Sequence, residues 1–100
     1  MNASLDPAIV AANVYKPVLE NARVRVFEAH FAPGDKAAWH DHPDHIIHVL
    51  TDASLRLTLP GGKTMDIAPR AGETMWMEAG PHEAVNTGKS EARLLVIELK

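Results

Sequence analysis

The sequence contains no cysteine, which excludes disulfide bonds, thiolate metal ligands and a cysteine nucleophile. Any bound metal must therefore use nitrogen and oxygen ligands. Only 5% of the residues are aromatic, so the core must be built mainly from valine, isoleucine, leucine, alanine and methionine. Positive charge is also scarce, because the formal net charge is −3 and the ten lysines and arginines are scattered along the chain. We therefore expect neither a nucleic acid nor a membrane as a partner, since both need a basic surface.

Long apolar runs are missing as well. No stretch approaches the roughly 18 residues that a membrane span needs, and residues 1–13 have neither the basic start nor the apolar core of a secretory signal. A cytoplasmic protein is therefore expected. The 100 residues, 46% hydrophobic and 23% charged, predict one globular domain, because two cores would each bury too little apolar surface.

From residue 14 onward, apolar and polar side chains alternate with a period of two, which predicts β-strands. Short turns rich in glycine and proline separate the expected strands, which cover residues 14–20, 23–31, 36–40, 45–50, 54–59, 63–67, 74–77, 82–86 and 93–99. This pattern is typical of an antiparallel sandwich or barrel. Residues 1–13 are expected to form a short N-terminal arm or helix, with Asp6 as N-cap and Pro7 at the first helical position. Residues 14–100 then form the single barrel domain.

Four of the six histidines lie within residues 40–48. On a strand, His40 and His42 point to the same side, about 7 Å apart along the chain. Two neutral imidazoles held in this way form half of a site for a transition metal. His45 becomes a further ligand candidate if the inner face continues past the break at residue 43, whereas His48 is expected to face away. The alternative is that these histidines are ordinary polar residues of a solvated loop.

His82 begins a predicted strand far downstream, after a Gly-Pro turn. In a closed antiparallel barrel, strands that are distant in sequence can face each other across the interior. His82 could then complete a facial set of ligands with His40 and His42. Arg25 and Arg56 could anchor a substrate carboxylate if they faced inward, although Arg56 alternates with leucines and is expected to face outward.

The spacing of these residues resembles the two motifs of the cupins. The first motif is matched by Gly34 and, after five residues, by His40-Asp41-His42. The second is matched by Gly72, Gly80, His82 and Asn86. The resemblance covers roughly residues 14–99, and residues 21–50 are most similar to small one-domain cupins named as β-alanine degradation proteins. It implies an all-β fold, a double-stranded β-helix (jelly-roll) barrel, with a mononuclear divalent metal inside and often a homodimer.

Two departures from the motifs bear on the site. Many cupins carry a glutamate a few residues after the second histidine, and His45 is the best-placed residue here. In the second motif, Glu78 replaces the usual proline and the turn before His82 is one residue shorter, which leaves the placement of His82 open. A site of three or four histidines leaves the full charge on the metal, which favours a small anionic ligand. Imidazoles suit iron, nickel, zinc or copper better than magnesium or calcium, and manganese also remains a candidate.

Our first hypothesis is a metal-dependent enzyme, dioxygenase-like or isomerase-like, in which His40, His42, His82 and the candidate His45 hold the metal. The substrate would be a small anionic metabolite of amino-acid or amine catabolism, and no catalytic residue is assigned. Because ligation needs neutral imidazoles, metal should be lost below about pH 6. Two alternatives remain open: a non-catalytic cupin that binds or senses a metal or small metabolite, and a structural cupin that has lost its metal.

Overall fold

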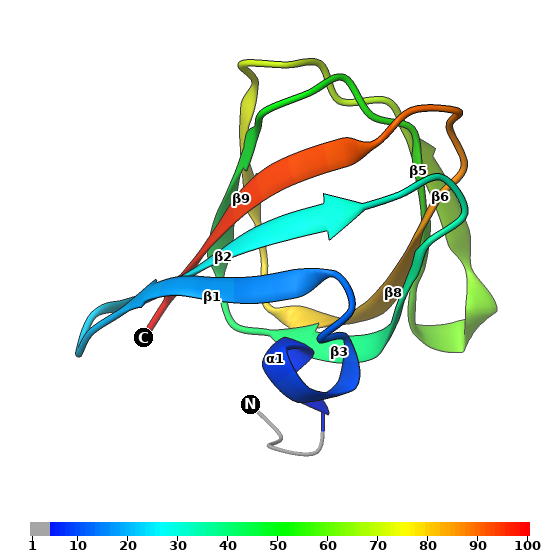
Figure 1. The fold of residues 1–100 in the computed structure, drawn as a ribbon. Coiled ribbons are helices and arrows are strands. Elements are labelled where there is room, and N and C mark those ends of the chain that lie inside the picture. Colours follow the sequence, from blue (N-terminus) through cyan, green and yellow to red (C-terminus); the bar gives the residue numbers. More distant parts are fainter. Residues whose placement is uncertain (1–4) are drawn as a thin grey trace.

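The computed structural model describes residues 5–100, and nine strands build it (Figure 1). The strands are β1 (Tyr15–Glu20), β2 (Val24–Phe31), β3 (Lys36–His42), β4 (His45–Val49), β5 (Leu55–Thr58), β6 (Thr64–Ile67), β7 (Thr74–Met77), β8 (Gly80–Asn86) and β9 (Ala92–Leu99). A short helix, α1 (Pro7–Val10), precedes them, and a helical turn, η2 (Pro60–Gly62), joins β5 to β6. None of these helices is long and apolar enough to cross a membrane.

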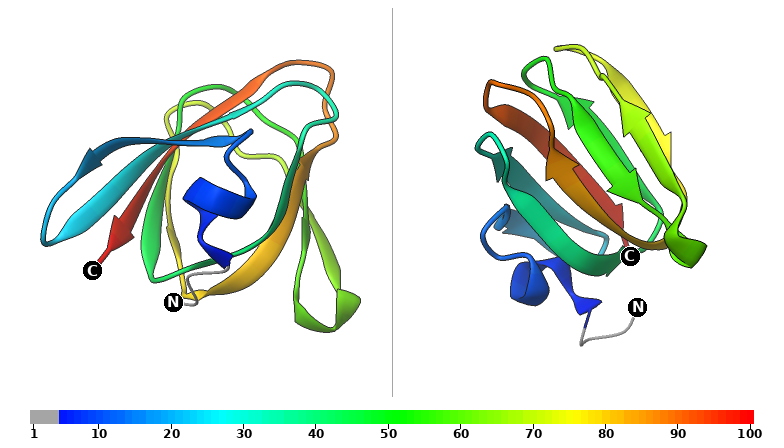
Figure 2. Two further views of the ribbon diagram at one scale, coloured as in Figure 1. Left: turned by 60° about the horizontal axis from the view of Figure 1, so that its bottom comes forward. Right: turned by 90° about the vertical axis from the view of Figure 1, so that its right-hand side faces the viewer.

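The strands form two antiparallel sheets that face each other across the interior (Figure 2). The five-stranded sheet has the order β1-β2-β9-β4-β7, and the four-stranded sheet has the order β3-β8-β5-β6. From β3 to β9 the chain passes repeatedly from one sheet to the other, which is the jelly-roll arrangement. The all-β fold predicted from the period of two is confirmed, and each of the nine expected strands is present.

Alternation along β2 and β9 builds the middle of the core. Their burial alternates residue by residue, and the two strands pair without interruption from Val24↔Leu99 to Phe31↔Ala92. Phe27 and Phe31 therefore point inward, where they pack with the apolar side chains of β9. With so few aromatic residues in the chain, aliphatic side chains fill the remaining space between the sheets.

The outer face of the five-stranded sheet carries an apolar row that crosses all five strands. Strand register places its members side by side in the order Leu19, Val26, Ile97, Ile46 and Trp76. Leu19 is 52% exposed and Trp76 is 53% exposed, so the two ends of the row are open to solvent.

The N-terminal segment, in the part that the structure describes, lies against β1 and β3. Asp6 caps α1, because its carboxylate accepts a 3.0 Å hydrogen bond from the backbone N–H of Ala8, and Pro7 occupies the first turn as predicted. Ala11 is fully buried in the core. Of the expected arm over residues 1–13, residues 1–4 lie outside the described residues, and the domain boundary at residue 14 stays a prediction.

Strands β3 and β8 are both longer than expected, and the difference positions the histidines. β3 continues to His42 rather than ending at His40, and β8 begins at Gly80 rather than at His82. The physical reason is that the two strands pair with each other, His40 opposite His82 and His42 opposite Gly80, so that their ladder extends both. The shortened turn before His82 therefore does not move it out of the sheet.

Candidate metal centre

Three histidines meet on the inner face of the β3–β8 pair. Because His40 and His82 are directly opposite in the ladder, they share a face, and His42 follows His40 by the two-residue period of the strand. All three are buried, with His40 completely inaccessible to solvent. Their ring centroids are 4.7 Å (His40–His42), 4.7 Å (His40–His82) and 5.3 Å (His42–His82) apart. One ring nitrogen from each lies within 4.8 Å of the others, which is compatible with binding a single metal ion.

The fourth candidate, His45, lies beside this triad and not within it. It is buried, and its ring centroid is 4.5 Å from that of His42, so the inner face does continue past residue 43. The group of nitrogens within 4.8 Å of one another comprises His40, His42 and His82 alone in residues 5–100. His48 lies on the opposite face of β4, where its Nδ1 is 2.9 Å from the hydroxyl of Thr74.

Oxygen acceptors hold the Nδ1 atoms of three histidines. The acceptors are the carbonyl of Ala38 for His40 at 2.6 Å, the Glu98 carboxylate for His42 at 2.6 Å and the carbonyl of Pro43 for His45 at 2.8 Å. Because these oxygens accept, each Nδ1 carries the proton and donates it, and the Nε2 lone pair stays available. The Nε2 of His40 is buried and has no hydrogen-bond partner in the described part of the chain. A buried lone pair without a donor fits a metal ligand.

Burial keeps these imidazoles neutral. Together with the repulsion from the neighbouring histidines, it lowers the pKa of His42 to about 2 and that of His82 to about 3. Burial also lowers the pKa values of His40 and His45. Only the neutral ring can bind a metal, so the site is in its ligating form at neutral pH. Protons are consequently expected to compete with the metal only at a pH lower than about 6, the value expected for ordinary imidazoles.

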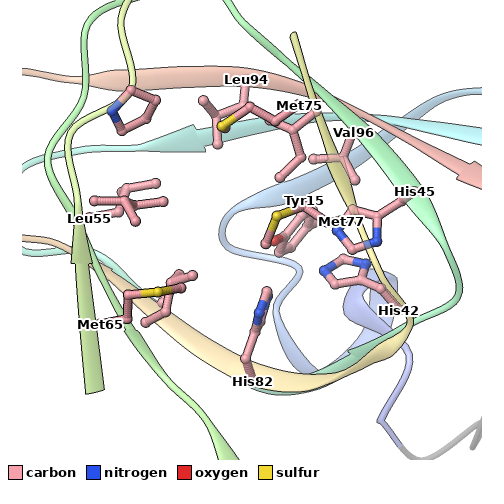
Figure 3. A pocket seen from close by; sticks show the side chains of 15 residues that line it. Tyr15, His42, His45, Leu55, Met65, Met75, Met77, His82, Leu94 and Val96 are labelled. Atoms are coloured by element: carbon pink, nitrogen blue, oxygen red, sulfur yellow. The ribbon is translucent and has the colours of Figure 1, made fainter. Parts of the chain in front are cut away.

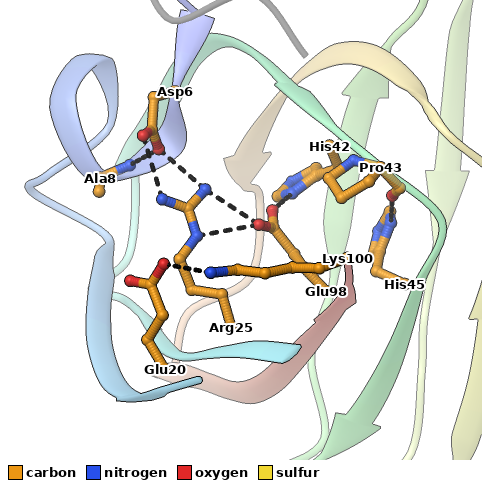
Figure 4. Close-up of polar contacts among 9 residues, drawn as sticks. All are labelled: Asp6, Ala8, Glu20, Arg25, His42, Pro43, His45, Glu98 and Lys100. Carbon is orange, nitrogen blue, oxygen red and sulfur yellow. Dashed lines mark hydrogen bonds and ion pairs between the residues drawn. The ribbon is translucent and has the colours of Figure 1, made fainter. Parts of the chain in front are cut away.

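Three charged residues, Asp6, Arg25 and Glu98, form a chain of hydrogen bonds that ends at His42 (Figure 4). The sequence alone did not predict this chain. Glu98 on β9 is 2% exposed and lies opposite Arg25 on β2. Arg25 donates from Nε and Nη2 to one oxygen of Glu98, at 3.1 and 2.9 Å, while His42 donates to the other oxygen. On its far side the guanidinium donates to Asp6 at 3.0 Å. Burial raises the pKa of Glu98, and the Arg25 charge opposes this shift.

A sequence signal for Glu98 did exist. Glu98 shares the inward-facing positions of β9 with Leu94 and Val96. Burying a carboxylate there without a partner would cost free energy, so a partner could be expected. Arg25 also faces inward, the orientation that anchoring a substrate carboxylate would require. Its guanidinium, however, binds Glu98 and Asp6. Arg56 faces outward as expected and pairs with Asp66 at 2.7 Å. Asn86 is structural, since its amide donates to the carbonyls of residues 31 and 90.

A cavity of about 100 Å³ opens beside the triad, between the two sheets (Figure 3). His42, His45 and His82 line it together with Tyr15, whose ring lies 5.0 Å from His40 and 5.4 Å from His42 between centroids. Every other lining residue is apolar. Burial raises the pKa of Tyr15, so its hydroxyl keeps its proton and can donate a hydrogen bond. The arrangement combines three available nitrogens, one neutral hydroxyl and a water-excluding wall.

We expect the metal-free protein to lose stability as the pH falls below 6.5. In the folded state the pKa values of His40, His42, His45 and His82 are lowered, whereas in the unfolded chain they return to about 6.5. Below this pH the unfolded state therefore binds more protons, and each histidine reduces the free energy of unfolding by up to about 1.4 kcal/mol per pH unit. Urea unfolding of chelator-treated protein at pH 7.5, 6.5, 5.5 and 5.0 would measure the slope. A free energy of unfolding that stays constant from pH 6.5 to 5.0 would contradict this expectation.

Comparison with known proteins agrees with the geometry. Residues 27–98 match the family described as Cupin domain. The chain is 35% identical over 85 residues to the Beta-alanine degradation protein BauB of Pseudomonas aeruginosa, a match that covers 82% of this chain and 87% of that protein. A cupin domain from Bordetella pertussis Tohama I has a TM-score of 0.81 and 28% identity, covering 87% of this chain and 92% of its own. The polyketide cyclase RemF from Streptomyces resistomycificus has a TM-score of 0.62 and 25% identity, covering 85% of this chain and 63% of its own. The chain belongs to the cupin domain family and, as its two motifs predicted, is a small cupin similar to β-alanine degradation proteins.

Proposed function

We propose that the protein is a metal-dependent cupin in which His40, His42 and His82 hold one divalent transition metal beside a small-molecule cavity. The observation that carries this proposal is the buried Nε2 of His40, which lacks a partner in residues 5–100 and lies in a group of three imidazole nitrogens within 4.8 Å. Iron, nickel, zinc, manganese and copper are the candidate metals, since imidazole nitrogens suit these ions. When bound, the metal would supply Lewis-acid activation or, if it is iron, reactivity toward dioxygen.

The protein's own groups would orient and enclose the ligand. Glu98 fixes the tautomer and the ring orientation of His42, and Arg25 holds the Glu98 carboxylate in place. Tyr15 can donate its hydroxyl proton in a hydrogen bond to a ligand in the cavity, because its pKa is raised. His45 stays a proposed fourth ligand, and its alternative role is to line the cavity next to His42.

The proposed reaction is dioxygenase-like or isomerase-like and acts on a small metabolite of amino-acid or amine catabolism. Support for this choice is the similarity to BauB, whose name refers to the degradation of β-alanine. A homodimer stays part of the proposal, and the apolar row on the outer face of the five-stranded sheet offers it a surface.

Binding or sensing without catalysis is the second candidate, and the lining of the cavity favours it. Among residues 5–100, no carboxylate or amine lines the cavity, and the buried Glu98 is already engaged by Arg25 and His42. A general base other than a histidine is therefore absent from the lining residues.

The metal content of untagged protein, purified at neutral pH, tests the proposal. We expect about one divalent transition metal per chain by elemental analysis, since the three imidazoles are neutral and available. Stoichiometric iron with substrate-dependent oxygen uptake would favour the dioxygenase reading, whereas zinc or nickel would favour isomerase-like chemistry. Protein that contains no metal and takes none up from a buffered metal solution would contradict the proposed function.

A further inference from the structure

The cavity beside the triad has a polar end and an apolar end. His42, His45, His82 and Tyr15 gather at one end, while Leu55 and Met65 lie at the other (Figure 3). Tyr15 carries the one hydroxyl among the lining residues, and three of the protein's four methionines contribute to the apolar wall. A ligand in this space therefore meets hydrogen-bonding groups at its head and only hydrocarbon or thioether groups along its body.

In the part of the chain that the structure describes, no lysine, arginine, aspartate or glutamate side chain lines the cavity. The two buried charged residues Arg25 and Glu98 are already paired with each other, and Arg25 also binds Asp6. A positively charged group buried beside Leu55, which is 4% exposed, would find neither a counter-charge nor an acceptor among the described lining residues, and burying it there would be costly. A single negative group, in contrast, can lie at the histidine end beside the metal-binding nitrogens.

The size of the cavity limits the body of the ligand. Its volume is about 100 Å³, whereas an apolar cavity of about 150 Å³ is large enough to bind benzene. By this ratio the space holds about four non-hydrogen atoms. Butyrate fits it when its two carboxylate oxygens point to the histidine nitrogens, and so does β-alanine, which differs from butyrate in carrying an ammonium group in place of the terminal methyl group.

We propose that the cavity binds small aliphatic monocarboxylates and rejects amino acids of the same size. The carboxylate head lies at the end formed by Tyr15 and the histidines, and the hydrocarbon chain extends toward Leu55 and Met65. This inference deepens the proposed function and rests on it, because the negative head needs the positive charge of the bound metal. β-Alanine itself, with an ammonium group at its far end, is therefore not a ligand of this site.

A titration of the zinc-loaded protein with butyrate and with β-alanine tests the inference. We expect the dissociation constant for butyrate to be at least about tenfold lower, because only the ammonium must be desolvated without a partner. In protein labelled at the methionine methyl groups, butyrate should shift the signal of Met65, which lines the apolar end. Equal or tighter binding of β-alanine would overturn the inference, and so would methionine signals that do not shift when butyrate is added.

Substitution at the rim gives a sharper version of the test. Met65 is 42% exposed and lines the apolar end, so that Met65→Asp can place a negative charge there without disturbing the core. We expect this variant to lose butyrate affinity and to gain β-alanine affinity, each by several-fold, because the ammonium now has a partner. Thr64→Asp is the matched control, since Thr64 is an exposed neighbour on β6 that does not line the cavity. The same change of preference in both variants would show a general charge effect and overturn the inference.

Two further measurements separate this inference from the proposed function. Zinc content, measured on the same samples, reports on the metal site alone, and Tyr15→Phe should keep its zinc while binding butyrate several-fold more weakly. Protein that takes up no zinc would overturn the proposed function together with this inference. Protein that binds zinc but prefers β-alanine to butyrate would overturn this inference alone.

Discussion

His82→Ala is expected to lower the affinity for zinc or nickel on the order of a hundredfold or more. Loss of an outer partner of a metal-bound histidine already costs about 10–100-fold in affinity, and loss of a ligand should cost at least as much. His82 contributes one of the three nitrogens within 4.8 Å of each other, and it comes from a different strand than His40 and His42. Two neighbouring histidines of β3 alone would leave the ion mostly in contact with water. Titration with a competing chelator would measure the affinity.

His48→Ala is the matched control for this experiment. His48 is also a histidine on a strand, but it lies on the opposite face of β4 and contacts Thr74. We expect it to keep the affinity of the wild type. Urea unfolding of both variants without metal would show that they are folded at the pH of the titration. If folded His82→Ala binds zinc as tightly as the wild type, the second motif does not contribute a ligand.

Arg25→Met is expected to lower the free energy of unfolding by about 3–5 kcal/mol, the range for breaking one side of a buried ion pair. The substitution removes the two hydrogen bonds from the guanidinium to Glu98 and the one to Asp6. Glu98 would then keep a buried charge with His42 as its only side-chain donor among the described residues. Because the pKa of Glu98 is raised in the folded state, its neutral form relieves this penalty at low pH. The deficit relative to the wild type should therefore be smaller at pH 5 than at pH 8.

Two variants make this expectation specific to the buried pair. Arg56→Met removes an arginine that pairs with Asp66 on the exposed surface, so its effect should stay within the error of the measurement. The double variant Arg25→Met with Glu98→Gln should recover part of the loss, because the unpaired carboxylate is gone. Equal destabilisation by Arg25→Met and Arg56→Met in urea unfolding would show that the buried pair does not stabilise the protein.

The sequence alone determined the strands, because the inward and outward positions of a strand are a local property that repeats every two residues. It also determined the two motifs, and with them the three histidines that the structure brings together. The spacing of His40 and His42 alone places them on one face, and the 4.7 Å between their ring centroids agrees with that placement. The expected ends of β3 and β8 were wrong by two residues each, since pairing between strands extended them.

Tertiary structure decided what the pattern could not. Glu98 lies 56 residues from His42 in sequence, and the two meet because β9 and β3 belong to different sheets that face each other. Arg25 likewise became the partner of Glu98 through the register of β2 with β9, not through any local motif. The cavity, whose described lining contains no lysine, arginine, aspartate or glutamate, arises from side chains of both sheets. Alternation specifies which side of a strand a residue occupies, whereas its neighbours across the barrel depend on strand order and register, which form only when the sheets close.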